Sequence, residues 1–305
     1  MSLPRRLLPT LGLLAVPLFT ACQSELSADL AVSAPTGASK VVLNVTKVDL
    51  EKESGSVTEY STGIDDAFDL LPYSQDEDYN DDDSYEGRLE LIDKDSVTGD
   101  FVGIRPVFDA TDSYVQLTSG TQVPISISSQ ADYAAISLSL SNNDTSGSDS
   151  EDIVITLELP FSLVESSDSS EYEFTPVIRA VKKDKSGSIS GTIPESSVTS
   201  GSCNSSAGSG VAVYVYSGSG VTPVDYYDDG SSANSYQPLA SSLLTYDSSD
   251  SEYIFKIRYL PPGDYTVAWT CDAASDVPNT SDSLTFIDSE DVTVTAGSTS
   301  SVTFD

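Results

Sequence analysis

The sequence predicts an all-β protein in which two antiparallel β-sandwich domains follow one another along the chain. Apolar residues alternate with polar ones over short stretches, as in Val41, Leu43 and Val45, and this period of two is that of a half-buried strand. Clusters of Ser, Asp, Gly and Asn separate these stretches, and no window of helical length carries an apolar stripe with a period of 3.6 residues. Short strands without helices are typical of a β-sandwich.

Residues 1–21 have the features of a secretory signal peptide. Arg5 and Arg6 precede an apolar run that ends in Leu18-Phe19-Thr20-Ala21. This run is too short for a bilayer, which takes about 20 apolar residues. Cys22 follows directly, and the arrangement resembles the lipobox of bacterial lipoproteins, which implies that Cys22 carries a lipid and begins the mature chain. An ordinary signal peptide with a chance cysteine is the alternative.

The residue after the cysteine bears on localisation. In such lipoproteins an Asp at this position implies retention in the inner membrane, whereas this chain has Gln23. The resemblance therefore implies a lipid anchor in the outer membrane, with the protein facing the periplasm or the cell surface. We expect residues 22–27 to form the lipidated tether.

Residues 28–181 are predicted to form the N-terminal sandwich. Pro124 lies within one predicted strand and indicates that this strand is at a sheet edge, because proline cannot donate to a ladder. The alternation predicts strands at 41–46, 88–92, 123–127, 136–140, 153–159 and 172–181.

Residues 182–186, Lys-Lys-Asp-Lys-Ser, are predicted to be a solvated linker, with a docking patch as the alternative. Residues 187–305 are predicted to form the C-terminal sandwich. In its strand at 264–271, alternation places Trp269 and Cys271 on the same face, which suits a buried disulfide beside a large aromatic ring. Pro261-Pro262-Gly263 predicts the turn before this strand, with Gly263 supplying a permissive position.

Motifs in both domains resemble known families. The segments 187–193, 260–267 and 292–297 (GSISGTI, LPPGDYTV and VTVTAG) are similar to the carboxypeptidase-regulatory-like, or prealbumin-like, sandwich, a fold that also resembles the starch-binding type of carbohydrate module. The segments 34–48 and 98–105 resemble a bacterial lipoprotein module called domain of unknown function 4382. These resemblances imply the fold and leave the activity open.

The charge of the chain excludes some partners. Acidic residues number 48 and basic residues 14. Loss of Arg5 and Arg6 with the leader leaves 12 bases and a net charge of −36 (12 − 48). Nucleic acid is excluded as a partner, because a phosphate backbone is bound through Lys and Arg, and attraction to an anionic membrane surface is disfavoured. The chain has no histidine, which excludes Ser-His-Asp and Cys-His catalysis and His-ligated zinc.

Three cysteines are present, and Cys22 is assigned to the lipid. This leaves Cys203 and Cys271 as an even pair in an oxidising compartment, and we expect a disulfide between them, with two buried free thiols as the alternative. The residues are 68 positions apart (271 − 203), so closing this loop would stabilise the fold by roughly 4 kcal/mol in the chain-entropy model.

Two groups of side chains are candidate ligand sites. An acidic stretch is rich in carboxylates that suit calcium, although we favour a solvated loop over an ordered calcium site. Aromatic residues beside carboxylates suggest a sugar platform, with one ring in the core and one covering an edge strand as the commoner alternative. The first group is Asp76, Asp78, Asp81, Asp82, Asp83 and Glu86, and the second is Tyr226, Tyr227 and Tyr236.

The sequence indicates a protein of the cell envelope rather than an enzyme. It contains no nucleophile elbow, phosphate loop or metal-ligand spacing, and its many acids make any one carboxylate pair uninformative. We expect a non-catalytic binding or structural module without a cofactor other than calcium. A carbohydrate-binding module and a calcium-binding adhesion protein are the alternatives, so the expected partner is a glycan or another envelope protein.

Overall fold

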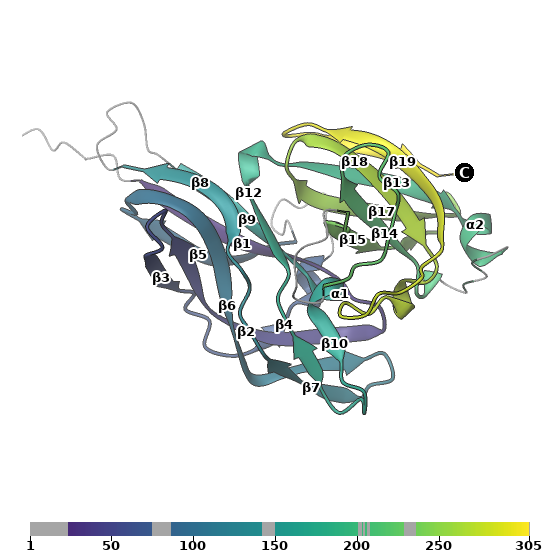
Figure 1. Ribbon diagram of the computed structural model, residues 1–305, viewed down its shortest axis with the longest axis horizontal. Coiled ribbons are helices and arrows are strands. Elements are labelled where there is room, and N and C mark those ends of the chain that lie inside the picture. The colour runs from purple at the N-terminus through teal and green to yellow at the C-terminus, as the bar shows by residue number, and fades with distance from the viewer. Residues whose placement is uncertain are drawn as a thin grey trace, which may run out of the picture.

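The computed structural model describes residues 24–74, 87–141, 150–200, 203, 205, 208–228 and 236–304. Two lobes built mainly of strands lie side by side, one formed by the first part of the chain and one by the second (Figure 1). The α-helices of the described residues are short, α1 (Leu159–Ser162) and α2 (Glu195–Thr199). In this part of the chain no helix has the length and apolar character needed to cross a membrane. The predicted all-β class is confirmed.

The described residues of the first lobe form twelve strands and two 3₁₀ turns. In chain order they are β1 (Glu25–Ser33), β2 (Ala38–Glu51), β3 (Val57–Ser61), β4 (Phe68–Asp69), η1 (Leu71–Ser74), β5 (Leu89–Asp95), β6 (Gly99–Leu117), β7 (Gln122–Ile127), β8 (Ala134–Leu140), β9 (Ser150–Glu158), β10 (Leu163–Glu165), β11 (Tyr172–Phe174), β12 (Ile178–Lys182) and η2 (Lys183–Lys185).

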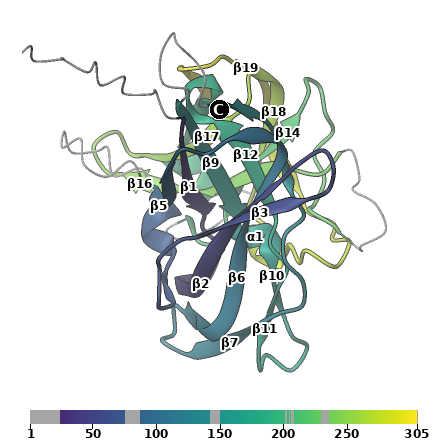
Figure 2. The same cartoon turned by 90° about the vertical axis from the view of Figure 1, so that its left-hand side faces the viewer.

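These strands form two sheets around one core. The smaller sheet has the order β12-β9-β1-β5, and the larger has the order β10-β11-β7-β6-β2-β3, with β4 on β2 and β8 on β6. Figure 2 shows β7, β10 and β11 together at one end of the lobe. The alternating residues of β2, Val41, Leu43 and Val45, are fully buried in a cluster that also contains Leu26 and Leu30 of β1. Alternation therefore identified the buried face of β2.

The prediction that the strand containing Pro124 lies at a sheet edge is wrong. β7 lies between β6 and β11 in the sheet. Its two halves use different neighbours, however, because residues 122–124 pair with β6 and residues 125–127 pair with β11. Pro124 therefore has a paired strand on one side only, and its missing N–H removes no ladder hydrogen bond on the other side.

Both segments predicted as connectors carry regular structure. β1 begins at Glu25, and Ser24 is completely buried, so only the first residues of the predicted tether precede the sheet. In the predicted linker, Lys182 ends β12 and residues 183–185 form η2. Ser186 is buried, and its carbonyl accepts a hydrogen bond of 2.7 Å from the Gly297 amide. The segment 182–186 is thus tied to the second lobe.

The second lobe also packs two sheets, with the orders β16-β17-β13-β20 and β15-β14-β18-β19. Its entry strand β13 runs parallel to the late strand β20, just as β1 runs parallel to β9 in the first lobe. The strands and the 3₁₀ turn are β13 (Gly187–Pro194), β14 (Ala212–Ser217), β15 (Ala240–Leu243), β16 (Thr245–Asp247), β17 (Glu252–Leu260), β18 (Gly263–Thr270), η4 (Ala273–Ser275), β19 (Phe286–Val294) and β20 (Thr299–Thr303).

Backbone geometry constrains two positions of the second lobe, a close approach of strands at Gly191 and a left-handed conformation at Tyr259. A Cβ on Gly191 would lie 2.4 Å from the Phe255 ring, so only glycine allows β13 to approach β17 this closely. At the corner between β17 and β18, the left-handed residue is Tyr259, with φ 56°, rather than Gly263. The pairing shifts register here, since Gly187 faces Leu260 whereas Ile189 faces Ile257. The prolines of this corner therefore follow a β-bulge.

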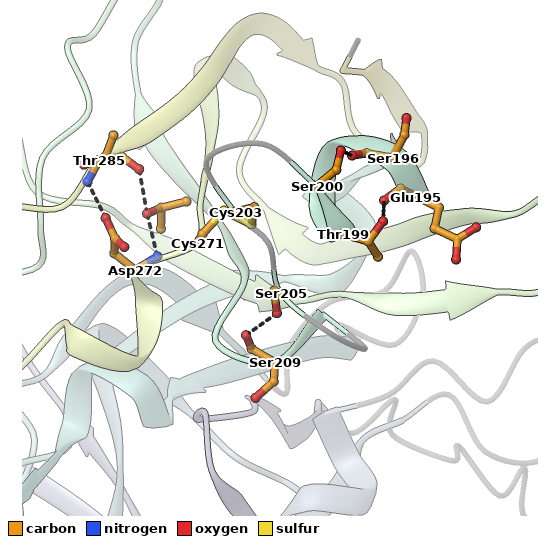
Figure 3. Close-up of a disulfide and its surroundings, with 11 residues drawn as sticks. Glu195, Ser196, Thr199, Ser200, Cys203, Ser205, Ser209, Cys271, Asp272 and Thr285 are labelled. Carbon is orange, nitrogen blue, oxygen red and sulfur yellow. Dashed lines mark hydrogen bonds between the residues drawn. A yellow bond between two sulfur atoms is a disulfide. The ribbon is translucent and has the colours of Figure 1, made fainter.

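The predicted disulfide between Cys203 and Cys271 is present, with their Cα atoms 5.3 Å apart. Figure 3 shows it joining the end of β18 to the segment that follows α2. Both cysteines pack against the core of the second lobe, which contains the fully buried Trp269. Trp269 and Cys271 therefore pack into the same core as predicted, although Cys271 follows the end of β18 and the pairing shifts register between Trp269 and Thr270.

Candidate functional site

The two lobes meet at an apolar cluster, which we call the junction cluster. Phe161 of α1 belongs to the first lobe, and its ring stacks on that of Tyr226, with centroids 4.3 Å apart. The same ring meets Tyr214 edge-on at 5.8 Å. Pro160 lies in the first turn of α1, where the missing N–H costs no hydrogen bond. The buried members of the junction cluster are Phe161, Ala212, Tyr214, Tyr216, Tyr226, Ala268 and Ala273.

A buried ion pair forms directly before α1, the helix that carries Phe161. Glu158, the last residue of β9, is 1% exposed, and its Oε1 accepts a hydrogen bond of 3.3 Å from Nε of Arg179 on β12. Its Oε2 accepts from Oγ of Ser33 at 2.6 Å and from the Ser241 amide at 3.3 Å. Burial raises the pKa of Glu158, and the Arg179 guanidinium and these donors oppose that rise. Because Ser241 belongs to the second lobe, this carboxylate binds both lobes.

Arg179 also reaches the second lobe. Its Nη2 donates to the carbonyl of Arg258 at 2.9 Å, and its Nη1 donates to the carbonyl of Tyr259. These carbonyls belong to the bulge at the end of β17. Arg258 in turn donates through Nη2 to the carbonyls of Tyr73 and Gly87 in the first lobe, at 3.2 and 3.3 Å. The two arginines therefore bind in opposite directions across the boundary, and we call this set of contacts the interlobe clasp.

A cleft of about 1030 Å³ adjoins the clasp. Its walls come from both lobes: the end of β1 and Thr156 of β9 on one side, and β13, β15, β17 and β20 on the other. Glu158 and Arg179 also line it. Cavities of several hundred Å³ with a few convergent polar groups are the usual form of a ligand site, which makes this cleft the leading candidate.

A second polar group lies in the loops beside the junction cluster. Carboxylate oxygens of Asp225, Asp276 and Asp282 lie within 4.8 Å of one another. Oδ2 of Asp276 accepts from the Tyr214 hydroxyl at 2.6 Å and from the Tyr226 amide at 3.4 Å. Burial is the main cause that raises the pKa of Asp276 to about 6. Three carboxylates supply part of the six to eight oxygens that Ca²⁺ takes, so these residues fit a hard cation by donor type.

The structure separates the tyrosines of the predicted sugar platform. Tyr226 is 7% exposed and has one ring face against Phe161, so the hypothesis that it offers an exposed stacking face is corrected. Tyr227 is half-buried, and Tyr236 is 62% exposed. The acidic stretch with Asp76, Asp78, Asp81, Asp82, Asp83 and Glu86 lies outside the described residues, as does Cys22.

The sequence reasoning missed Glu158 and Arg179. A usable signal was present, since each is a lone charge between apolar neighbours, in Leu157-Glu158-Leu159 and in Ile178-Arg179-Ala180. A charge inside an otherwise apolar strand indicates a buried pair, because an unpaired buried charge is strongly unfavourable. The partner of each charge, and the fact that they lie between two lobes, are not encoded in either local pattern.

Comparison with family models and with curated proteins gives no match. The resemblances inferred from the motifs therefore stay predictions. Three solved structures share low sequence identity with the chain and have TM-scores of 0.19, 0.19 and 0.20. They are the Bacillus anthracis TIE protein (10% identity, 93% of this chain and 33% of that one), the minor pilin GBS52 of Streptococcus agalactiae (12%, 92% and 94%) and a protein provisionally assigned to cell adhesion from Bacteroides fragilis (9%, 92% and 92%).

The chain thus spans a third of the length of the Bacillus anthracis protein. At these TM-scores the likenesses carry no argument about the function of this chain.

Proposed function

We propose that the chain is a non-catalytic lipoprotein of the outer membrane that holds two rigidly joined β-sandwiches at the cell envelope as a binding or structural module. The leader, the cysteine at position 22 and Gln23 after it support the anchoring. The disulfide between Cys203 and Cys271 supports export, because such bonds persist in oxidising compartments.

The observation that carries the proposed role is the interlobe clasp together with the junction cluster. Glu158 and Arg179 hydrogen-bond to the second lobe from positions that are almost inaccessible to water, and Phe161 fills an aromatic pocket beside them. Joining two domains flexibly needs no such interface, since domain interfaces are by default small and mobile. A fixed arrangement of two sandwiches suits the presentation of a surface to a partner.

The start of β1 sets how the module would sit on the membrane. Glu25 lies three residues after Cys22 (25 − 22), and an extended chain spans at most about 3.6 Å per residue. If Cys22 carries the lipid, the first lobe stays within about 11 Å of the bilayer. The short reach favours a module held close to the membrane surface over one on a long stalk.

Mass spectrometry of the protein purified from cell membranes tests the anchoring. We expect the mature N-terminus to be an acylated Cys22, and we expect Cys22→Ser to move the protein from the membrane fraction to the soluble fraction with an intact fold by circular dichroism. Ser24→Ala is the matched control and should keep the lipid. An unmodified Cys22 with residues 1–21 still attached would refute the proposal.

A further inference from the structure

The cleft between the lobes has the size and position of a binding site. Its volume of about 1030 Å³ lies at the upper end of the ~300–1,000 Å³ that is usual for small-molecule sites. Both lobes contribute walls, and hydrogen bonds of the clasp connect those walls. A site of this kind is largely preformed, so a ligand would not have to bring the lobes together.

Two buried hydroxyl groups in the cleft wall have no hydrogen-bond partner in the described part of the chain. They are Oγ1 of Thr156, on a residue that is 5% exposed, and Oγ of Ser241, on a residue that is 6% exposed. Buried hydroxyls are nearly always hydrogen-bonded, and leaving one without a partner is costly. A polar group that enters the cleft would supply these two hydroxyls with a partner.

These two hydroxyls flank the carboxylate of the clasp. Thr156 and Glu158 are two positions apart on β9, so their side chains lie on the same face of the strand. Ser241 approaches from the other lobe and donates its amide to Glu158. Each lobe thus contributes one unpartnered hydroxyl to the same polar centre.

The outer part of the cleft is also lined by hydroxyl-bearing side chains. Residues Ser190 and Thr192 of β13, on the opposite face from the buried Ile189 and Ile193, line it together with Ser301 and Thr303 of β20. Another lining residue is Tyr246, which is 43% exposed, and its ring lies 5.1 Å from that of Tyr253. The wall therefore combines many hydroxyls with one exposed aromatic ring.

The charges in the cleft do not favour an anionic ligand. The Arg179 guanidinium already binds Glu158 and two carbonyls, and Arg258 donates to two carbonyls of the first lobe. The other charged residues of the lining, Lys256 and Asp247, have opposite signs. An apolar ligand would leave the hydroxyls of Thr156 and Ser241 unpaired. A neutral ligand with many hydroxyls, such as a sugar, needs no free cation and can pair with the hydroxyls of Thr156 and Ser241, because each sugar hydroxyl both donates and accepts. The C–H face of a sugar ring also packs on an aromatic ring.

We propose that the interlobe cleft binds a neutral oligosaccharide, with the hydroxyls of Thr156 and Ser241 bonding to sugar hydroxyls at its floor and Tyr246 packing on a sugar ring. This inference rests on the proposed role as a binding module and names its ligand class and site. The volume favours several sugar units over one.

Isothermal titration of the full chain in detergent micelles tests this, with maltohexaose, cellohexaose, laminarihexaose and chitohexaose as the four probes. We expect at least one hexasaccharide to bind saturably. Thr156→Val with Ser241→Ala removes both hydroxyls with little change of shape and should weaken binding by about 10-fold or more, at about 1 kcal/mol per hydrogen bond. Tyr246→Ala should weaken the same binding. The matched control, Thr58→Val with Ser137→Ala on β3 and β8, should leave the affinity unchanged.

The other outcomes separate the alternatives. The cleft proposal is wrong if none of the four probes binds, or if binding survives the loss of both cleft hydroxyls. Ordered water would then be the hydrogen-bond partner of Thr156 and Ser241. If Tyr236→Ala abolishes binding while the cleft variants retain it, the ligand binds at the exposed tyrosine instead. Lipid attachment at Cys22 is measured independently, so failure of the cleft proposal leaves the anchoring proposal standing.

Discussion

The two faces of strand β14 are both buried, but by different parts of the molecule. Val213 and Val215 face the core of their own lobe, where Trp269 and Phe304 also pack. Tyr214 and Tyr216 face the other way, into the junction cluster with Phe161 of the first lobe. The second lobe is therefore not an independent domain on a linker, because the first lobe covers one face of one of its sheets.

The two faces also differ in how they are stabilised. The inner face belongs to a core that a disulfide closes, whereas the outer face adjoins the interlobe clasp and the carboxylate of Asp276.

Replacing Arg179 by Met should have the largest effect. The change leaves the carboxylate of Glu158 buried without its guanidinium, and breaking a buried pair in this way costs about 3–5 kcal/mol. We expect the free energy of unfolding to fall by this amount and a single calorimetric transition to split into two as the lobes uncouple. Scanning calorimetry measures both.

The control for this experiment is Lys47→Met. Its ion pair with Glu59 is 3.0 Å long, with the two side chains 44% and 58% exposed, and exposed pairs contribute about 1 kcal/mol or less. A similar small effect for Arg179→Met would contradict the view that the clasp couples the lobes.

Removing the disulfide should destabilise the inner face. Closing the loop of 68 residues constrains the unfolded chain by roughly 4 kcal/mol in the entropy model, although measured losses are commonly about 2–5 kcal/mol. The variant Cys203→Ser with Cys271→Ser should therefore unfold its second lobe at a lower denaturant concentration. Unfolding followed by Trp269 fluorescence reports this lobe, and an unchanged midpoint would exclude a stabilising role for the bond.

Replacing Phe161 by Ala should open the outer face at a cost of about 3 kcal/mol, as for other buried Phe→Ala changes. Burial raises the pKa of Tyr226 to about 12. Loss of the stacked ring should lower that pKa toward 10, which ultraviolet difference titration against the unaltered chain can follow. Phe161→Leu keeps most of the apolar area, so the pKa of Tyr226 in this variant should lie between its values in Phe161→Ala and in the unaltered chain. No shift in the tyrosine titration would indicate that Phe161 does not cover Tyr226 in solution.

The smallest effect is expected at Asp276. Its folded-state pKa of about 6 lies above the ordinary 3.8, so its protonated form is favoured in the fold. The resulting stability is fully present below pH 3.8 and is lost as the pH rises through 6. Asp276→Asn keeps an acceptor for the Tyr214 hydroxyl, and we expect it to be about 2 kcal/mol more stable than the unaltered chain at pH 8 and equal to it near pH 4.

Asp291 provides a control of opposite sign. Hydrogen bonds from the Gly220 amide and the Thr266 hydroxyl hold the pKa of this exposed carboxyl below its usual value. Its contribution is therefore present above pH 3.8 and is lost as the pH falls through the folded-state pKa, so Asp291→Asn should be less stable at pH 7 and converge at low pH. Chemical denaturation across the pH range checks both variants. Parallel curves for the two would contradict the assignment.

Local sequence determined many of the strands and their buried faces, although the strand predicted at 172–181 is in fact two strands, β11 and β12, that belong to different sheets. The alternation of side chains with a period of two assigns Val41, Leu43 and Val45 to the core of the first lobe, and Trp269 and Cys271 to the core of the second. The cysteine count determined the disulfide, since two thiols remain once Cys22 is set aside.

Tertiary structure alone decided what covers the other faces. The sequence leaves open whether Tyr226 belongs to an exposed sugar platform or to the core, and the structure places its ring against Phe161, 65 residues earlier in the chain (226 − 161). Glu158, Arg179 and Ser241 come together in the same way. A periodic pattern records which residues of a strand share a face, but it does not record which distant segment packs on that face. That choice depends on how two whole lobes fit together, and so the candidate cleft became visible only in three dimensions.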